Sequence, residues 1–145
     1  MPFRPLRLCV AYDGARGLCG RVVPRMREML EHRAFDVDVH EVGAGGLDLA
    51  PYRGLVLGTP VTGLALRGAG PSARLRAWIE ALPSLEGVPV ALFCVYEVRP
   101  GTTFDRMKNL VLGKGGTVVA EQAFWVLAPR RDDHVIPAEC MVRIR

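Results

Sequence analysis

An almost uninterrupted apolar run from Val88 to Tyr96, VPVALFCVY, constrains the fold more than any other feature of this sequence. The run is far shorter than the roughly 18 apolar residues that a membrane-spanning helix needs. Its β-branched and aromatic residues favour a strand. A strand without a polar face must be covered on both faces, as central strands of parallel sheets are. The run therefore predicts an α/β protein built on a parallel sheet.

Four other segments have the patterns of strands. Leu6–Tyr12 and Arg53–Gly58 are short and apolar, which is typical of buried strands. Phe35–Val42 begins with strict alternation of apolar and polar residues, which indicates an exposed or edge strand. Thr117–Leu127 is rich in valine and aromatic residues and is the last predicted strand.

Amphipathic helices are predicted between most of these strands. The segments with helical spacing of apolar residues are Val22–His32, Ser72–Leu82 and a third that Thr102 or Thr103 can cap and that closes at Gly113–Gly116. Pro24 suits a first helical turn, so the first helix should begin near Val23. Helical crossovers between strands call for a single doubly wound, mostly parallel sheet of five strands.

The composition favours one cytoplasmic domain. The 145 residues fit a single domain over 1–145, and the hydrophobic half of the chain argues against disorder. The N-terminus lacks the apolar stretch of a signal peptide. The net charge is +4, but the arginines are spread along the chain without interleaved aromatics. We therefore expect neither a nucleic-acid nor a membrane partner.

Side-chain chemistry is weakly represented. None of the four cysteines forms a C-x-x-C pair, so no metal site made by this chain alone is expected. Cys19 lies near a predicted helix N-terminus, which can lower a thiol pKa, and a catalytic thiol there is one hypothesis. The three histidines, His32, His40 and His134, are far apart and are predicted at the surface. No nucleophile–base pair stands out, so no catalytic residue is assigned and hydrolysis ranks last.

The loops after the first, third and fourth predicted strands are the best candidates for a ligand site. Ligands of open parallel sheets bind outside the carboxyl ends of the strands, where the strand order reverses. The loops concerned are Asp13–Cys19, Thr59–Pro71 and Glu97–Thr103. The first leads into a helix, whose N-terminal amides suit phosphate, and it contains Gly14 and Gly17 with Gly20 just beyond, which allow close backbone approach.

The pattern resembles flavodoxins and related FMN-binding domains from about Leu6 to Leu127. The stretches that carry the resemblance are Val10–Tyr12 followed by Gly17, Tyr52–Pro60 with its G-[ST]-P turn and the later Gly63, Leu85–Phe93, and Phe104 onward to Gly115–Val119. The resemblance implies the strand order 2-1-3-4-5. It also implies an FMN-binding electron-transfer domain, hence an electron carrier or flavin-dependent oxidoreductase with a redox partner protein.

The same resemblance suggests which residues would hold FMN. Mainly backbone groups would contact the phosphate, at Gly14, Ala15, Arg16, Gly17, Leu18 and Cys19. One side of the flavin ring would be lined by Thr59, Pro60, Val61, Thr62 and Gly63, and the other by Tyr96 and Glu97.

Three features depart from the family pattern. The phosphate loop is degenerate, because the hydroxyls and the amide that flavodoxins carry there are replaced by Gly14, Arg16, Leu18 and Cys19. The glycine of the loop is kept as Gly17. Thr62 occupies the usual place of an aromatic residue. After Ala128 the last helix is missing or replaced by a short tail, so a homodimer or a partner protein could cover the sheet.

These departures leave a second hypothesis open, a flavin-free interaction or small-anion-binding module. Arg16, Arg67 and Arg99 fall at the predicted ligand edge and could bind an anion or an acidic partner. The two hypotheses differ at the phosphate loop. Side chains of Leu18 and Cys19 that pointed into the site would speak against a flavin.

Overall fold

A five-stranded sheet forms the centre of the computed structural model, which describes residues 6–43, 47–61, 70–97 and 101–126. All strand pairs are parallel, and the order is β2-β1-β3-β4-β5. The strands are β1 (Leu6–Tyr12), β2 (Phe35–Glu41), β3 (Gly54–Pro60), β4 (Pro89–Tyr96) and β5 (Thr117–Trp125). The predicted α/β class, the doubly wound sheet and the order 2-1-3-4-5 are thus confirmed.

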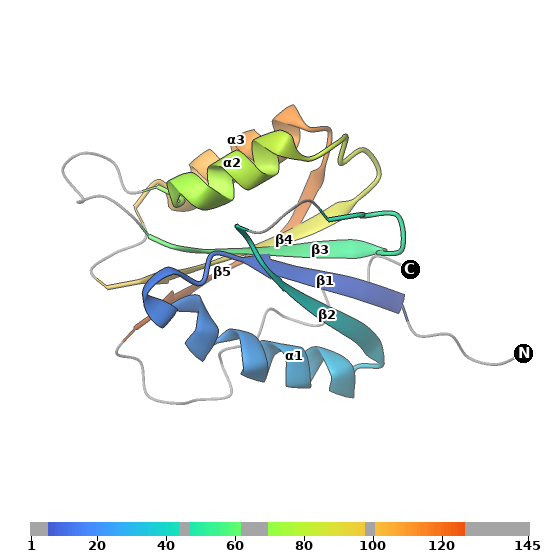
Figure 1. Cartoon of the computed structure of the whole chain (residues 1–145), viewed down its shortest axis with the longest axis horizontal. Coiled ribbons are helices and arrows are strands. Elements are labelled where there is room, and N and C mark those ends of the chain that lie inside the picture. Colours follow the sequence, from blue (N-terminus) through green and yellow to red (C-terminus); the bar gives the residue numbers. More distant parts are fainter. Residues whose placement is uncertain (1–5, 44–46, 62–69, 98–100, 127–145) are drawn as a thin grey trace, which may run out of the picture.

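Helices cover both faces of the sheet. They are α1 (Val23–His32), α2 (Ala73–Ala81) and α3 (Thr103–Gly113). Figure 1 shows α1 on one face and α2 and α3 side by side on the other. The loop between β1 and α1, predicted at Asp13–Cys19, contains two short 3-10 helices, η1 (Ala15–Gly17) and η2 (Cys19–Arg21).

Local sequence signals place the helix starts. Pro24 lies in the first turn of α1, as predicted. Ser72 caps α2, since its hydroxyl oxygen accepts a hydrogen bond from the Leu75 amide at 3.2 Å. Thr102 occupies the N-cap position of α3, but its side chain does not make the predicted capping bond there.

Alternate residues of the central strands enter two separate cores. In β1, Leu8 packs in the core on the α1 side, while Cys9 packs in the core beneath α2 and α3. Phe93 and Leu92 divide in the same way in β4. All of these side chains are fully buried, which explains why β4 reads as one apolar run.

The two edge strands of the sheet are β2 and β5. β2 is an edge strand with polar positions, as predicted, and its Asp38 accepts hydrogen bonds from Arg7 at 2.6 Å and from the Tyr52 hydroxyl at 2.8 Å. β5 forms the other edge and ends at Trp125. The predicted tail beyond Ala128 lies outside the described residues. No helix within the described ranges is long and apolar enough to cross a membrane.

Candidate functional site

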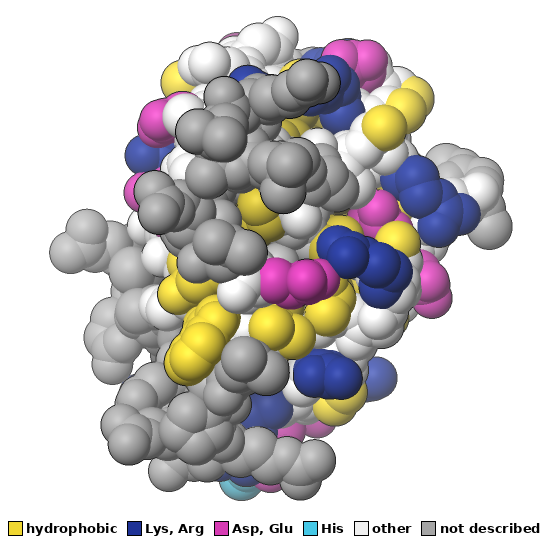
Figure 2. All heavy atoms as spheres, turned by 90° about the vertical axis from the view of Figure 1, so that its left-hand side faces the viewer, with side chains coloured by type: hydrophobic (Ala, Val, Ile, Leu, Met, Phe, Trp, Pro, Cys, Tyr) yellow, Lys and Arg dark blue, Asp and Glu magenta, His cyan; other side chains and the backbone are white. Residues whose placement is uncertain are grey.

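The carboxyl ends of β1, β3 and β4 meet at one edge of the sheet. The amide of Asp13 donates to the Gly58 carbonyl at 3.1 Å, which continues the ladder between β1 and β3 past the end of β1. In the chain, β1 leads to β2 on one side, and β3 leads to β4 on the other, so this junction is the topological switch point. Figure 2 looks onto this edge, where hydrophobic side chains lie beside acidic and basic ones.

The loop after β1 turns its apolar side chains away from the edge. Leu18 is 7% exposed and Cys19 is fully buried, both in the core on the α1 side. The amide of Gly17 donates to the Gly14 carbonyl at 3.0 Å, and Gly17 has a left-handed φ of 68°. Arg16 shares this conformation with φ 60° and is exposed. Neither Leu18 nor Cys19 therefore blocks the site with its side chain.

The predicted low thiol pKa of Cys19 is wrong. Burial raises the pKa of this thiol, and the nearby Asp13 and Cys94 raise it further. Helix amides can lower a thiol pKa only where the sulfur faces them and not an apolar core. The thiol of Cys19 is therefore a core group, and the hypothesis of a catalytic thiol is dropped.

We expect Cys9, Cys19 and Cys94 to resist the thiol reagent DTNB in the native protein at about pH 8, where an ordinary cysteine is partly ionised. All three are free and buried, and burial raises the pKa of Cys9 and of Cys94 to about 12. A Cys140→Ser variant removes the fourth thiol from the assay. After denaturation, the three thiols should react at once. Fast reaction of one thiol in the native variant would contradict this prediction.

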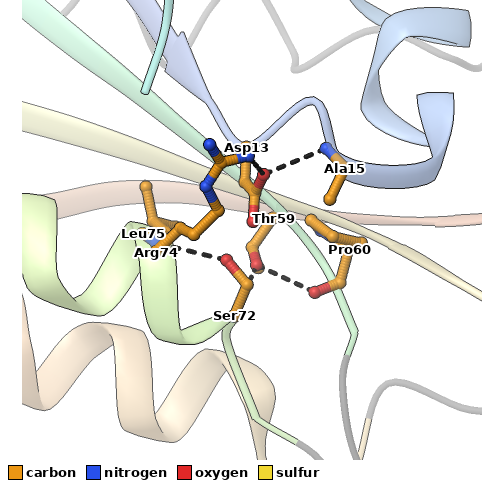
Figure 3. A network of polar contacts seen from close by, with 7 residues as sticks. All are labelled: Asp13, Ala15, Thr59, Pro60, Ser72, Arg74 and Leu75. Carbon is orange, nitrogen blue, oxygen red and sulfur yellow. Dashed lines mark hydrogen bonds and ion pairs between the residues drawn. The ribbon is translucent and has the colours of Figure 1, made fainter. Parts of the chain in front are cut away.

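A buried carboxylate stands at the head of the loop after β1. Asp13 is 1% exposed, and its Oδ1 accepts a hydrogen bond from the Ala15 amide at 3.0 Å (Figure 3). The guanidinium of Arg74, at the start of α2, lies 3.8 Å from the same oxygen. Gly14 lies beside the Glu41 carboxylate, with which a Cβ at position 14 would collide. Two carboxylates therefore lie beside this loop, Asp13 from the loop itself and Glu41 from the end of β2.

The loop after β3 is tied down by a buried hydroxyl. Thr59 donates from Oγ1 to the Pro60 carbonyl at 2.8 Å and accepts from the Ser72 amide at 2.9 Å (Figure 3). Thr59 is fully buried and Pro60 is buried as well, whereas Val61 is half-buried. The Thr59 hydroxyl therefore holds the loop against the start of α2. Thr62 and Gly63 lie outside the described residues.

An ion pair joins the loop after β1 to the loop after β4. Arg16 Nη1 lies 2.9 Å from Glu97 Oε1, and both side chains are more than half exposed. Such a surface pair contributes little stability, so it can open at little cost. The structure therefore brings together two loops that are 81 residues apart in the sequence. Arg67 and Arg99 lie outside the described residues.

Two aromatic residues, Tyr96 and Trp125, end neighbouring strands at this edge, and only Tyr96 was predicted as a site residue. Tyr96 is half-buried and pairs in register with Trp125 of β5. Trp125 is 45% exposed, and its indole N–H donates to the Glu97 carbonyl at 3.2 Å. Trp125 could have been identified from the sequence as an aromatic residue near the end of a predicted strand. The pair offers a planar ligand two rings beside the loop after β4.

Metal-binding side chains do not gather in the described ranges, since no group of three or more histidine, cysteine, aspartate or glutamate residues there could hold a metal ion. His32 is exposed, as expected. His40 is half-buried against Trp78, with ring centroids 5.8 Å apart, so it does not lie freely at the surface. His134 lies outside the described residues.

No protein-family model and no curated protein matches the sequence. Solved structures of flavodoxins match the fold. Two-electron-reduced Megasphaera elsdenii flavodoxin superposes with a TM-score of 0.73 at 21% identity, over 84% of this chain and 88% of its own. Bacillus cereus flavodoxin 2 gives 0.72 at 16% identity, over 95% and 94%.

A Fusobacterium nucleatum flavodoxin variant bound to flavin mononucleotide gives a TM-score of 0.63 at 18% identity, over 78% of this chain and 67% of its own. Identities this low carry information on the fold and not on the ligand. The strand order, the placement of the helices and these superpositions together show that this chain is a flavodoxin-like domain.

Proposed function

We propose that this domain binds a flavin at the carboxyl edge of the sheet and passes electrons to a partner protein. The observation that carries the proposal is the convergence of the loops after β1, β3 and β4 at the switch point, with Leu18 and Cys19 turned into the core. The side chains of Leu18 and Cys19 therefore do not cover the backbone of this loop, in which the amides of Ala15 and Gly17 already have partners. Open parallel sheets bind their ligands at this place.

The residues at this edge fit the ring of a flavin. Half-buried Tyr96 and exposed Trp125 offer aromatic surface, and Val61 offers apolar surface on the neighbouring loop. The backbone of the loop after β4, which already accepts a bond from Trp125 at Glu97, would orient the ring. A bound flavin would supply electron transfer in one- or two-electron steps, so no side chain of this chain need act as acid or base.

The phosphate of FMN fits the site less well than the ring does. FMN is the flavin that the family resemblance implies and that the Fusobacterium protein binds. The loop that would hold its phosphate begins with the buried carboxylate of Asp13, which already accepts the Ala15 amide. Glu41 adds a second carboxylate beside Gly14. The proposal therefore concerns a flavin, with FMN and riboflavin both used as probes.

The partner would present an acidic surface to this domain. The chain carries a net charge of +4, and complementary charge raises the rate of association between proteins. A homodimer is a further expectation. The cytoplasm is the compartment proposed, because the three described cysteines are free thiols, as proteins of reducing compartments have.

A titration of the purified protein tests the flavin proposal. We expect FMN or riboflavin to bind with submicromolar affinity and to lose fluorescence on binding. Replacing Tyr96 with leucine should weaken the binding about fivefold, because a ring–ring contact contributes on the order of 1 kcal/mol. Tyr52→Leu is the matched control, because Tyr52 precedes β3 and so lies at the amino ends of the strands, away from the carboxyl edge. Its hydroxyl bonds to Asp38 of β2, and the amide of the next residue, Arg53, donates to the Arg7 carbonyl at the start of β1.

Absence of saturable binding of either flavin would reject this function. A flavin-free interaction module would then be the better hypothesis. It is favoured by the two contacts that satisfy the loop without a ligand, Asp13 with the Ala15 amide and Arg16 with Glu97.

A further inference from the structure

Asp13 lies at the topological switch point, immediately after β1. Its amide is bonded to the Gly58 carbonyl of β3, so the residue is held at the junction of β1 and β3. Its carboxylate is 1% exposed and heads the loop that leads to α1. A solvated carboxylate would be screened by water, but a buried one acts on its neighbours through a medium of low dielectric constant.

The positive charge around Asp13 only partly offsets this carboxylate. Arg74 lies 3.8 Å away, and its own side chain is 58% exposed to solvent. Arg16, the cation within the loop, is paired with Glu97 at 2.9 Å. Glu41, beside Gly14, adds further negative charge. An anion arriving here would meet two carboxylates, one of them buried, and it would reach Arg16 only by opening the exposed ion pair of Arg16 with Glu97.

The carboxylate also occupies a hydrogen-bond donor of the loop. Asp13 Oδ1 accepts the Ala15 amide at 3.0 Å, and the Gly17 amide is used by the Gly14 carbonyl. A phosphate bound to a loop of this kind depends on such backbone amides. The Asp13 carboxylate is therefore an anion that the loop already binds through one of its own amides.

From this arrangement we infer that Asp13 sets the ligand specificity of the edge, which takes a flavin that ends in a neutral polyol in preference to one that ends in a phosphate. The inference rests on the flavin-binding function proposed above. The ribityl chain of riboflavin is neutral and is not repelled by the buried carboxylate, whereas a phosphate dianion is. Riboflavin is thus the favoured class of ligand, and FMN the disfavoured one.

Parallel titrations with riboflavin and FMN at low salt test this inference. We expect the native protein to bind riboflavin at least about tenfold more tightly than FMN, because like charges repel more strongly where the carboxylate is shielded from water. In Asp13→Asn, the affinity for FMN should rise about tenfold or more, and that for riboflavin should change little. The amide oxygen of asparagine can still accept the Ala15 amide, so the turn is retained.

Asp48→Asn is the matched control. Asp48 Oδ1 accepts the Ala50 amide at 3.0 Å, which is the same kind of turn, but Asp48 is exposed and precedes β3. This variant should leave the affinities for both flavins unchanged. If Asp13→Asn does not unfold cooperatively on heating, Asp13→Ser replaces it, since a serine hydroxyl can also accept the amide.

Each outcome decides the inference. Equal or tighter binding of FMN than of riboflavin by the native protein, with a ratio that Asp13→Asn leaves unchanged, would overturn it and leave the flavin proposal standing. If the native protein binds neither flavin, the proposed function fails. In that case, a gain of FMN binding in Asp13→Asn would still support the exclusion of phosphate by Asp13. If Asp13→Asn also failed to bind FMN, the inference would be overturned.

Discussion

Replacing Gly58 with alanine is expected to destabilise this domain by about 3 kcal/mol, because overpacking a tight core forces the backbone or its neighbours to move. Gly58 pairs with Phe93 across β3 and β4, and a Cβ at position 58 would overlap the Phe93 ring. That ring is fully buried and stands edge-on to Phe124, with centroids 6.2 Å apart. It therefore has little room to move. The free energy of unfolding in urea measures the loss.

Two variants control this experiment. Gly20→Ala adds the same methyl group where no heavy atom lies within 4 Å, so its effect should be within about 0.5 kcal/mol. The double variant Gly58→Ala with Phe93→Leu should show a favourable coupling of about 1 kcal/mol or more, because the smaller side chain clears the overlap. A Gly58→Ala variant as stable as Gly20→Ala would show that β3 and β4 do not pack as described.

The second large effect is expected for Thr59→Val, with a loss of about 3 kcal/mol, because two buried backbone groups lose their partner. Valine has the shape of threonine without the hydroxyl. The Ser72 amide and the Pro60 carbonyl, which both bond to that hydroxyl, would be left unsatisfied. The start of α2 should loosen, and the Ser72 amide should exchange its hydrogen faster than in the native protein.

Thr59→Ser separates the hydroxyl from the methyl group. It keeps both hydrogen bonds and removes one buried methyl group, so a loss of only about 0.8 kcal/mol is expected. If Thr59→Val were no less stable than Thr59→Ser, the hydroxyl would not be what holds the loop after β3. Because Arg74 follows Ser72 at the start of α2, Thr59→Val should also loosen the contact between Arg74 and Asp13.

The strands and helices could largely be predicted from short windows of the sequence. β1 matches its predicted bounds residue for residue, and α1 begins at Val23, where Pro24 places it. Differences occur at ends, where β3 runs on to Pro60 and β5 ends at Trp125. Thr102 illustrates a second kind of miss, because residue type alone does not say which group completes a helix start.

The candidate site was predictable as a set of loops but not as a set of contacts. Where the structure describes them, the predicted loops lie at the carboxyl edge of the sheet, but the side chains of Leu18, Cys19 and Thr59 are buried. Trp125 was not predicted, because no local pattern indicates that the end of the last strand lies beside the loop after β4. The pairing of Arg16 with Glu97 spans 81 residues, and no local pattern indicates it.

The sequence by itself determined the α/β class, because apolar periodicity is a property of neighbouring residues and decides which faces must be buried. Only the tertiary structure decided the chemistry of the edge. In the sequence, Asp13 has the character of a solvated turn residue. In the fold, its amide bonds to the Gly58 carbonyl of β3, and its carboxylate lies beside Arg74 of α2. The sheet buries the sulfur of Cys19 and raises its pKa, although its place before a helix suggests the reverse. Burial and charge depend on which distant segments meet, and strand register and helix packing set that.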